Sequence, residues 1–269
     1  MAATDPQTGY ASVNGLNMFY EVHGSGRPLV LLHGALSTTE VDFGAVLPAL
    51  GKTRQVIAVE QQAHGHTADI DRPLTIQHMA DDTVGLLRQL GVEQADLFGY
   101  SMGAGIALQI AVQDPELVRK LAVASLAFRH DGLHPGLLDG LEQVTPEALA
   151  GTPFEASYAR TAPNPADWPT LVAKVQDLNR HIPEWSPDAI RSLAAPTLII
   201  IGDSDIVRPE HAVEMFRLLG GGVIGDVAGL PRSQLAVLPG TTHITLVHRA
   251  DWLSSTIGEF LDAPVPAAT

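Results

Sequence analysis

Apolar residues in this chain gather in short continuous runs, separated by longer stretches in which they recur every three or four positions. Six runs have the length of a strand, at residues 28–32, 55–59, 95–98, 121–124, 196–201 and 235–238. Continuous apolar character is typical of strands that are buried on both faces of a parallel sheet. The helical stretches between them supply the crossovers that parallel strands need. The pattern therefore predicts an α/β protein with a mostly parallel sheet.

The remaining elements follow from turn and helix-end signals. Residues 10–22 are predicted to form a β-hairpin, because Asn14-Gly15 is the strongest two-residue hairpin signal. Helices are predicted at residues 40–50, 76–90, 102–112, 209–219 and 248–261. The glycine-rich segment 220–232 is expected to be an insertion before the last strand.

The alternation of strands and helices fails over residues 130–187. This stretch has no strand-like apolar run, and it holds eight of the 19 prolines and two of the three tryptophans. We predict a helical cap at 130–187, folded over the carboxyl ends of the strands, where ligands bind in open α/β sheets. Residues 1–129 and 188–269 would then form the core.

Composition excludes several classes of function. The 269 residues include 16 Lys+Arg and 30 Asp+Glu, a formal net charge of −14, so no basic surface is expected for nucleic acid or an anionic membrane. The chain has no cysteine, which excludes disulfides, a thiolate metal site and a cysteine nucleophile. Residues 1–8 are polar and lack the pattern of a secretory signal, so a cytoplasmic location is expected.

The segment Gly99-Tyr100-Ser101-Met102-Gly103 lies between a predicted strand and a predicted helix. That is the context of a nucleophile elbow, a strained turn that exposes a serine hydroxyl above the sheet. The residues two positions either side of the serine must be small, because strand and helix nearly touch there, and both are glycine. We therefore predict that Ser101 is a nucleophile.

A serine nucleophile needs a base, and the base needs an acid that orients it. The acid is expected in Ile201-Gly202-Asp203-Ser204-Asp205, which follows a buried strand and so emerges at the ligand-binding edge. Asp203 lies where the chain turns and is suited to capping that turn. Asp205, one step further out, is the better candidate for the acid.

Three histidines follow the acid candidates in the sequence. His211 falls in the first turn of a predicted helix and His248 opens another, whereas His243 lies on the loop that leaves the last predicted strand. His243 is therefore the predicted base. Serine, aspartate and histidine then occur in one of the known chain orders for this device.

The oxyanion of an acyl-transfer reaction needs two backbone N–H donors. The N–H of Met102 is one candidate, because it follows the nucleophile and opens a helix. The other is expected from His33-Gly34-Ala35, which follows the first buried strand. Ala35 is the first choice for this second donor, and Leu36 is the alternative.

Together these motifs resemble an α/β-hydrolase-fold serine hydrolase of the capped, carboxylesterase-like kind. The matching segments are Leu32-His33-Gly34-Ala35, the elbow at 99–103, Gly202-Asp203-Ser204-Asp205 and Pro239-Gly240-Thr241-Thr242-His243. The resemblance implies an eight-stranded, mostly parallel sheet flanked by helices, with the second strand antiparallel and a cap after the sixth strand. It implies no cofactor.

The chain departs from that family in the loop after the fourth strand. Members usually carry an aspartate there and a serine at the end of the loop, where this chain has Glu60 and Thr67. The loop is structural in the family, so we expect the departure to leave the catalytic residues untouched. His64 and His66 lie in the same loop, but no third ligand is evident, and we predict no metal site.

The predicted function is hydrolysis of small to medium, largely uncharged carboxylic esters or lactones through an acyl-enzyme. Ser101 stands where haloalkane dehalogenases and epoxide hydrolases of this fold carry aspartate, which favours acyl transfer. A cofactor-free haloperoxidase or perhydrolase, a C–C bond hydrolase and an amidase would use the same residues and remain alternatives. The least favoured alternative is a non-catalytic ligand receptor.

Some expectations rest on weaker signals. The candidate pocket residues are His33, Tyr100, Phe128, His130, Trp168 and Trp185. The only expected partner is the small-molecule ester or lactone, with no nucleic acid and no membrane. The chain is expected to be a monomer or a homodimer.

Overall fold

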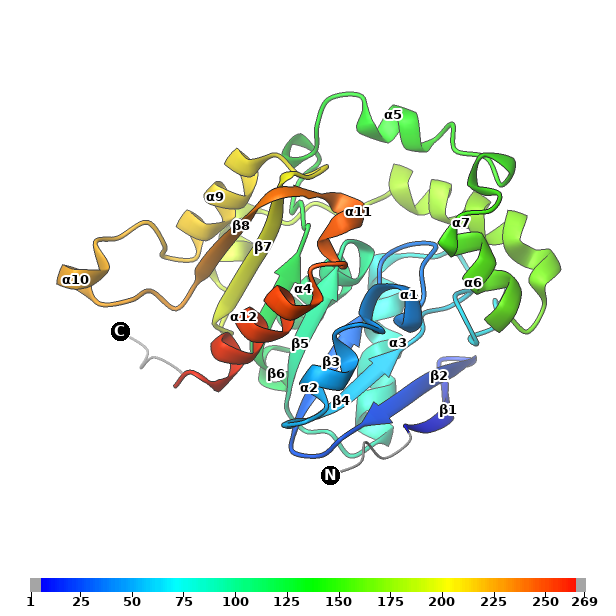
Figure 1. Cartoon of the computed structure of the whole chain (residues 1–269), viewed down its shortest axis with the longest axis horizontal. Coiled ribbons are helices and arrows are strands. Elements are labelled where there is room, and N and C mark those ends of the chain that lie inside the picture. The colour runs from blue at the N-terminus through cyan, green and yellow to red at the C-terminus, as the bar shows by residue number, and fades with distance from the viewer. Residues whose placement is uncertain (1–5, 265–269) are drawn as a thin grey trace.

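Eight strands form one sheet, which is the centre of the molecule (Figure 1). This is a computed structural model, and it describes residues 6–264. The strands are β1 (Gln7–Val13), β2 (Leu16–His23), β3 (Arg27–Leu32), β4 (Arg54–Val59), β5 (Ala95–Tyr100), β6 (Val118–Ala124), β7 (Thr197–Ser204) and β8 (Gln234–Thr242). Their order is β1-β2-β4-β3-β5-β6-β7-β8, and β2 is antiparallel to both of its neighbours. All other neighbouring pairs are parallel, so the predicted fold class is confirmed.

Helices cover both faces of the sheet. They are α1 (Thr39–Phe43), α2 (Leu47–Leu50), α3 (Ile76–Gln89), α4 (Met102–Gln113), α5 (Leu137–Leu141), α6 (Pro153–Thr161), α7 (Trp168–Arg180), α8 (Pro187–Arg191), α9 (Pro209–Leu218), α10 (Gly225–Ala228), α11 (His243–Leu246) and α12 (Ala250–Asp262). Short 3₁₀ turns occur at Pro115–Leu117, His130–Gly132, Glu147–Leu149 and Pro165–Asp167.

One of the helix predictions was wrong in its bounds. The helix expected at 40–50 is two short helices, α1 and α2, because the chain turns at residues 44–46, where Gly44 caps α1. Glycine is a poor helix former, which accounts for the break. The helix expected at 248–261 is preceded by the separate short helix α11.

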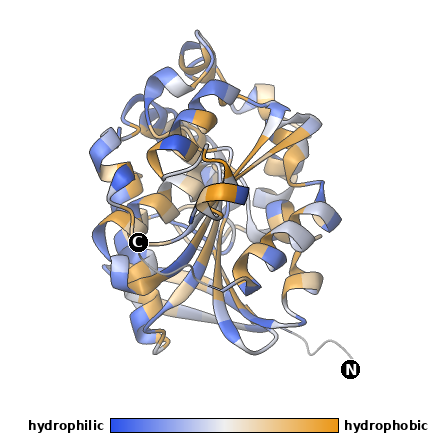
Figure 2. Cartoon of the chain, turned by 90° about the vertical axis from the view of Figure 1, so that its left-hand side faces the viewer, coloured by the Kyte–Doolittle hydropathy of each residue, from blue (hydrophilic) through white to orange (hydrophobic). Residues whose placement is uncertain are grey.

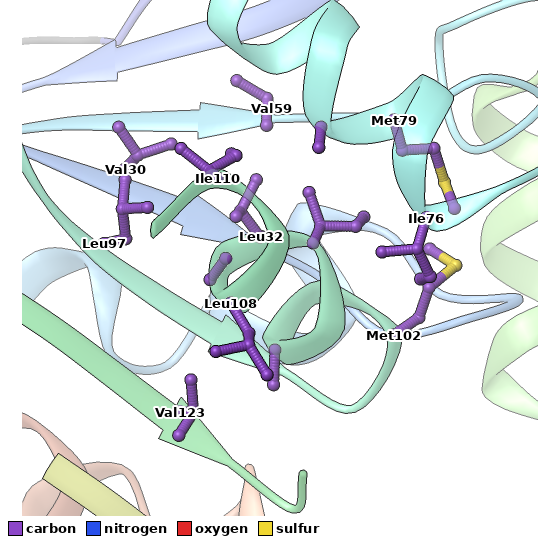
Figure 3. Close-up of a cluster of buried hydrophobic side chains, with 14 of the residues drawn as sticks. Val30, Leu32, Val59, Ile76, Met79, Leu97, Met102, Leu108, Ile110 and Val123 are labelled. Carbon is purple, nitrogen blue, oxygen red and sulfur yellow. The ribbon is translucent and has the colours of Figure 1, made fainter. Parts of the chain in front are cut away.

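The core lies in two layers, one on each face of the sheet. Val30 and Leu32 of β3 belong to the cluster beneath α3 and α4 (Figure 3), whereas Leu29 and Leu31 belong to the cluster under α1, α2 and α12. Neighbouring residues of a strand point to opposite faces, so a strand between two layers must be apolar throughout. The strands in the middle of the molecule are accordingly the most apolar part of the chain (Figure 2).

Residues 125–196 separate β6 from β7 and contain α5 to α8 but no strand. We call this segment the insertion; it includes the cap predicted at 130–187, and α8 straddles the predicted boundary. Its helices α5, α6 and α7 lie beyond one end of the strands (Figure 1). The division into core and cap stays a prediction. Among residues 6–264, no helix is both long and apolar enough to cross a membrane.

Candidate active site

The elbow at the end of β5 is strained as predicted for an exposed serine. Ser101 has φ 54° and ψ −118°, a backbone conformation that non-glycine residues rarely adopt. A Cβ on Gly103 would lie 1.9 Å from the Leu32 carbonyl oxygen, and one on Gly99 would lie 2.2 Å from the Gly103 carbonyl oxygen. Only glycine fits at either position, because strand and helix meet there backbone to backbone.

Three side chains from distant parts of the chain meet above this elbow. The Ser101 Oγ lies 3.1 Å from Nε2 of His243, and the Nδ1 of that imidazole lies 3.0 Å from Oδ1 of Asp205. Because the carboxylate accepts a hydrogen bond from Nδ1–H, the proton is held on Nδ1 and Nε2 is left to accept from the serine hydroxyl. His243 is the first residue of α11, directly after β8, and not part of a loop.

The surroundings of Asp205 favour its ionised form. Burial alone would raise the pKa of this carboxyl, but hydrogen bonds from His243 and Ser125, together with the imidazole charge, hold it below the usual value. The Ser125 hydroxyl donates to Oδ2 over 2.6 Å. Ser125 follows β6 and has φ 56°, a backbone conformation that no sequence signal predicts. No motif in the sequence pointed to Ser125.

Asp203 has a different role. Its exposed carboxylate accepts hydrogen bonds from the backbone N–H groups of Gly240 and Thr241, at 2.9 and 3.1 Å. These two bonds lower the pKa of the Asp203 carboxyl. Asp203 therefore ties the end of β7 to the end of β8, instead of capping its own turn as its position suggested.

Tyr100 supports the histidine from the strand side. Its phenol donates to the backbone carbonyl of His243 over 2.8 Å, and the two ring centroids are 5.1 Å apart. Burial raises the pKa of the phenol, so it remains a neutral donor. Tyr100 therefore holds the start of α11 in place.

The turn after β3 has one backbone N–H with no partner. Gly34 N–H donates to Oδ2 of Asp42 over 2.7 Å, Leu36 N–H donates to Nε2 of His64 over 3.1 Å, and Ser37 N–H donates to the Gly34 carbonyl over 3.4 Å. Within residues 6–264, Ala35 N–H has no hydrogen-bond acceptor. The N–H of Leu36, the alternative oxyanion donor, is already hydrogen-bonded to the imidazole of His64.

Met102 offers the second such N–H. As the first residue of α4, its N–H has no intrahelical acceptor, and it has no other acceptor among the described residues. Both Ala35 and Met102 line the cavity that opens over Ser101. Two residues whose N–H groups have no acceptor among the described residues therefore line the same cavity as Ser101, and an oxyanion site needs two such donors.

Two buried histidines hold the turn after β3 from behind. His33 Nδ1 donates to the Gly34 carbonyl, and His33 Nε2 accepts from Gln61 N–H. His64 Nδ1 donates to the Gln62 carbonyl, which leaves Nε2 to accept from the turn. Burial lowers the pKa of each imidazole to about 4, and in His33 the nearby imidazole adds to this effect. Both rings are therefore neutral at neutral pH.

A second buried carboxyl, that of Asp42, faces the site from α1. It accepts from Gly34 N–H and from the Ser37 hydroxyl, each over 2.7 Å, and it lines the same cavity. Burial raises its pKa to about 6, although both hydrogen bonds and the charge of His243 oppose the shift. No motif marked Asp42 in the sequence, although its two partners lie only eight and five positions before it.

The cavity above Ser101 has a volume of about 370 Å³ and mostly aliphatic walls. The insertion contributes much of the wall, through Leu126, Leu133, Leu137, Leu138, Leu141, Val144, Leu149, Phe154, Val172, Val175, Leu178 and Ile182. Among the candidate pocket residues, Tyr100, His130 and Trp185 line the cavity.

The other three candidate pocket residues lie elsewhere, and those predictions were wrong. His33 is fully buried behind the turn after β3, with both ring nitrogens bonded. Phe128 is fully buried and stacks on His211 at 4.2 Å between ring centroids. Trp168 packs against Tyr158 at 5.3 Å. Aromatic character alone did not distinguish the core of the insertion from the cavity wall.

The loop after β4 is not isolated from the site. Glu60 accepts from the backbone N–H of His66 at 2.6 Å, and Thr67 donates to the Glu60 carbonyl at 2.7 Å. The same loop carries His64, which reaches the turn after β3. The loop therefore contacts the candidate oxyanion turn through His64. Among the described residues it makes no hydrogen bond to Ser101, Asp205 or His243. Among residues 6–264, no group of three or more His, Asp or Glu side chains is arranged to hold a metal ion.

Comparison with known proteins assigns the chain to a family. Residues 27–249 match the model of the alpha/beta hydrolase fold family. The chain is 29% identical to 2-hydroxymuconate semialdehyde hydrolase of Pseudomonas sp. (strain CF600), over 88% of each chain. It is 25% identical to serine hydrolase BPHL of Mus musculus, over 93% of this chain and 84% of that one.

Solved structures share the fold. A meta-cleavage product hydrolase from Pseudomonas fluorescens superposes with a TM-score of 0.76 at 21% identity, covering 95% of this chain and 97% of the other. The enol-lactonase from Burkholderia xenovorans superposes with a TM-score of 0.71 at 20% identity, covering 94% and 100%. At these identities the likeness concerns the fold alone.

Proposed function

Since the chain belongs to the alpha/beta hydrolase fold family, we propose that it is a serine hydrolase that cleaves carboxylic esters or lactones through an acyl-enzyme. One observation carries the proposal. Ser101, His243 and Asp205 form a continuous hydrogen-bonded chain at an apolar cavity. The same cavity is lined by Ala35 and Met102, whose backbone N–H groups have no acceptor among residues 6–264. This arrangement has a nucleophile, a base, an orienting acid and an oxyanion site in reach of one carbonyl group.

The proposed reaction uses these residues in two stages. Ser101 Oγ attacks the carbonyl carbon while Nε2 of His243 takes its proton, and the oxyanion is held by the N–H groups of Ala35 and Met102. The C–O bond then breaks, and His243 gives the proton to the departing alkoxide. Water next attacks the acyl-enzyme with His243 as base, which releases the acid and restores the serine. Asp205 stabilises the imidazolium throughout.

The cavity supports a largely uncharged substrate. Its aliphatic walls would bury an apolar acyl or alcohol group, which is favourable by about 25 cal/mol per Å² of apolar surface removed from water. The guanidinium of Arg129, at the cavity wall, is bonded to Asp131 and Glu214. His130 at the wall is bonded to the Ile182 carbonyl. Neither side chain stands ready to receive a substrate carboxylate.

C–C bond hydrolysis is the second candidate. The 29% identity to a 2-hydroxymuconate semialdehyde hydrolase, over most of both chains, favours it. Perhydrolysis and amide hydrolysis would use the same three residues. A non-catalytic receptor is the least favoured reading, because such proteins often lose a member of the catalytic set and this chain has all three.

The experiment is hydrolysis of p-nitrophenyl esters of increasing acyl length and of a set of lactones, with Ser101→Ala as control. We expect wild-type turnover that Ser101→Ala lowers by several orders of magnitude. Covalent labelling by a fluorophosphonate at Ser101 would locate the nucleophile. If wild type and variant are equally inert towards all esters and lactones, the proposed function is wrong.

A further inference from the structure

Asp42 is a buried carboxyl group that the proposed reaction does not use. It lies in α1, only 4% exposed, and at the wall of the cavity above Ser101. Its counterpart in the same helix, Glu40, points to the surface and pairs with Arg160. Burying a carboxylate without a cation is costly. Buried titratable groups beside a cleft are frequently functional.

The contacts of Asp42 reach both ends of one turn. One carboxylate oxygen accepts from Gly34 N–H and the other from the Ser37 hydroxyl, each over 2.7 Å. A single side chain therefore bridges the first and last residues of the turn after β3. The residue between them that matters for the reaction is Ala35, whose N–H is the proposed oxyanion donor.

Besides Asp42, two imidazoles hold the turn: His33 bonds the Gly34 carbonyl and His64 bonds the Leu36 N–H. Leu36 has φ 61°, a conformation that costs free energy for a residue with a side chain. The backbone bond from Ser37 N–H to the Gly34 carbonyl is long, at 3.4 Å. The surrounding side chains must therefore impose the conformation, and His64 does so at Leu36.

We propose that Asp42 is a positioning residue that fixes the Gly34–Ser37 turn, through its two hydrogen bonds, so that Ala35 N–H faces the oxyanion formed at Ser101. The proposal rests on the proposed function. It assigns the effect to hydrogen-bond acceptance, and an asparagine can reproduce most of it. The asparagine oxygen can accept from Gly34 N–H while its amide donates to the Ser37 hydroxyl, which is able to accept.

The test compares Asp42→Ala, Asp42→Asn and Ser37→Ala with wild type, using the best p-nitrophenyl ester of the panel. Glu40→Ala is the matched control, because it removes the other carboxylate of α1. We expect Asp42→Ala to lower kcat by about 10- to 100-fold with KM changed less than about threefold, since a misplaced donor weakens only oxyanion binding. Asp42→Asn should keep kcat within about fivefold of wild type. The kcat of Ser37→Ala should lie between those of Asp42→Ala and Asp42→Asn, because it removes one of the two hydrogen bonds.

A second readout excludes a merely structural role. A trifluoromethyl ketone that adds to Ser101 forms an oxyanion, so its affinity should fall in Asp42→Ala in step with kcat/KM, while the melting temperature changes little. Equal kcat losses in Asp42→Asn and Asp42→Ala would overturn the proposal, as would wild-type kcat in Asp42→Ala. An inert wild type would instead overturn the proposed function, and this proposal with it.

Discussion

At the amino ends of the parallel strands, Asp96 accepts two hydrogen bonds from Arg119, at 2.7 and 2.6 Å, and lies 3.9 Å from Arg54. At the carboxyl ends, Asp205 accepts from His243 and Ser125. Both carboxyls are buried, yet their pKa values move in opposite directions. Burial raises that of Asp96 despite its arginines, whereas hydrogen bonds and the imidazole lower that of Asp205 despite burial.

The cations at the amino edge also bind the end of α12. Lys120 donates to the carbonyls of Phe260 and Ala263, each over 2.6 Å, and Arg119 donates to that of Leu261 over 2.8 Å. These carbonyls are the ones that a helix C-terminus leaves unpaired, and cations are favourable there. Burial lowers the pKa of the Lys120 ammonium, so this contact is made at a cost.

The difference between the two edges lies in which polar groups face a cavity. At the amino edge Arg119 and Lys120 bond the carbonyls at the end of α12, and the one buried donor left over among the described cations there is Nε of Arg54. At the carboxyl edge the N–H groups of Ala35 and Met102 and the hydroxyl of Ser101 face a cavity. Substitutions at the two edges should therefore separate activity from stability.

The largest effect is expected from Asp205→Asn. An asparagine cannot hold the imidazole with its proton on Nδ1, so kcat should fall roughly 10⁴-fold with a small change in stability. Asp203→Asn is the matched control, because Asp203 bonds only the turn at residues 240–241 and the neighbouring Ser204, and it should cost less than about tenfold. Ester hydrolysis kinetics check both, and the reverse order would transfer the acid role to Asp203.

Asp96→Asn is expected to lower stability and to leave activity unchanged. Loss of this charge leaves Arg119 without its carboxylate, whereas Arg54 keeps its ion pair with Asp262 at 2.5 Å. The free energy of unfolding should fall by about 3–5 kcal/mol. The folded fraction should keep wild-type kcat. Urea denaturation measures the effect, with Asp114→Asn as control, since its pair with Arg88 is exposed and should matter by less than about 1 kcal/mol. A large loss of kcat in folded Asp96→Asn would refute the separation of the two edges.

The smallest effect concerns the neutral histidines behind the turn after β3. The pKa of His64 is about 4 in the fold and near 6.5 when unfolded, so the unfolded state binds more protons between these values. Stability should be constant in this respect above pH 6.5 and fall as the pH drops towards 4. The raised pKa of Asp42 acts in the opposite sense.

His64→Gln isolates the histidine, because Asp42 contributes equally to both proteins. Unfolding free energies measured from pH 7.5 to 4.5 should fall less steeply in the variant, with a difference that approaches about 3 kcal/mol at the acid end. His78, a partly exposed histidine of α3, provides the control substitution His78→Gln. Parallel curves for His64→Gln and wild type would show that His64 is not held neutral.

Much of the sheet was predictable because its signals are local. The apolar runs place β3 to β7 within a few residues, since a strand between two helical layers must be apolar on both faces. β8 was predicted too short, at 235–238, because it is an edge strand that the structure extends to Gln234–Thr242. The break between α1 and α2 was missed because helical spacing continues across it.

The sequence by itself determined the elbow at Ser101 and the two side chains that meet it. Glycine spacing, strand exits and chain order identified Ser101, Asp205 and His243, because each of these signals depends on neighbours along the chain. Tertiary structure alone decided the rest of the site. Which N–H of the turn after β3 keeps no acceptor depends on the bonds from Gly34 to Asp42 and from Leu36 to His64, which lie 8 and 28 positions apart in the sequence. No motif indicates either contact, because the packing of the folded chain decides where these side chains point.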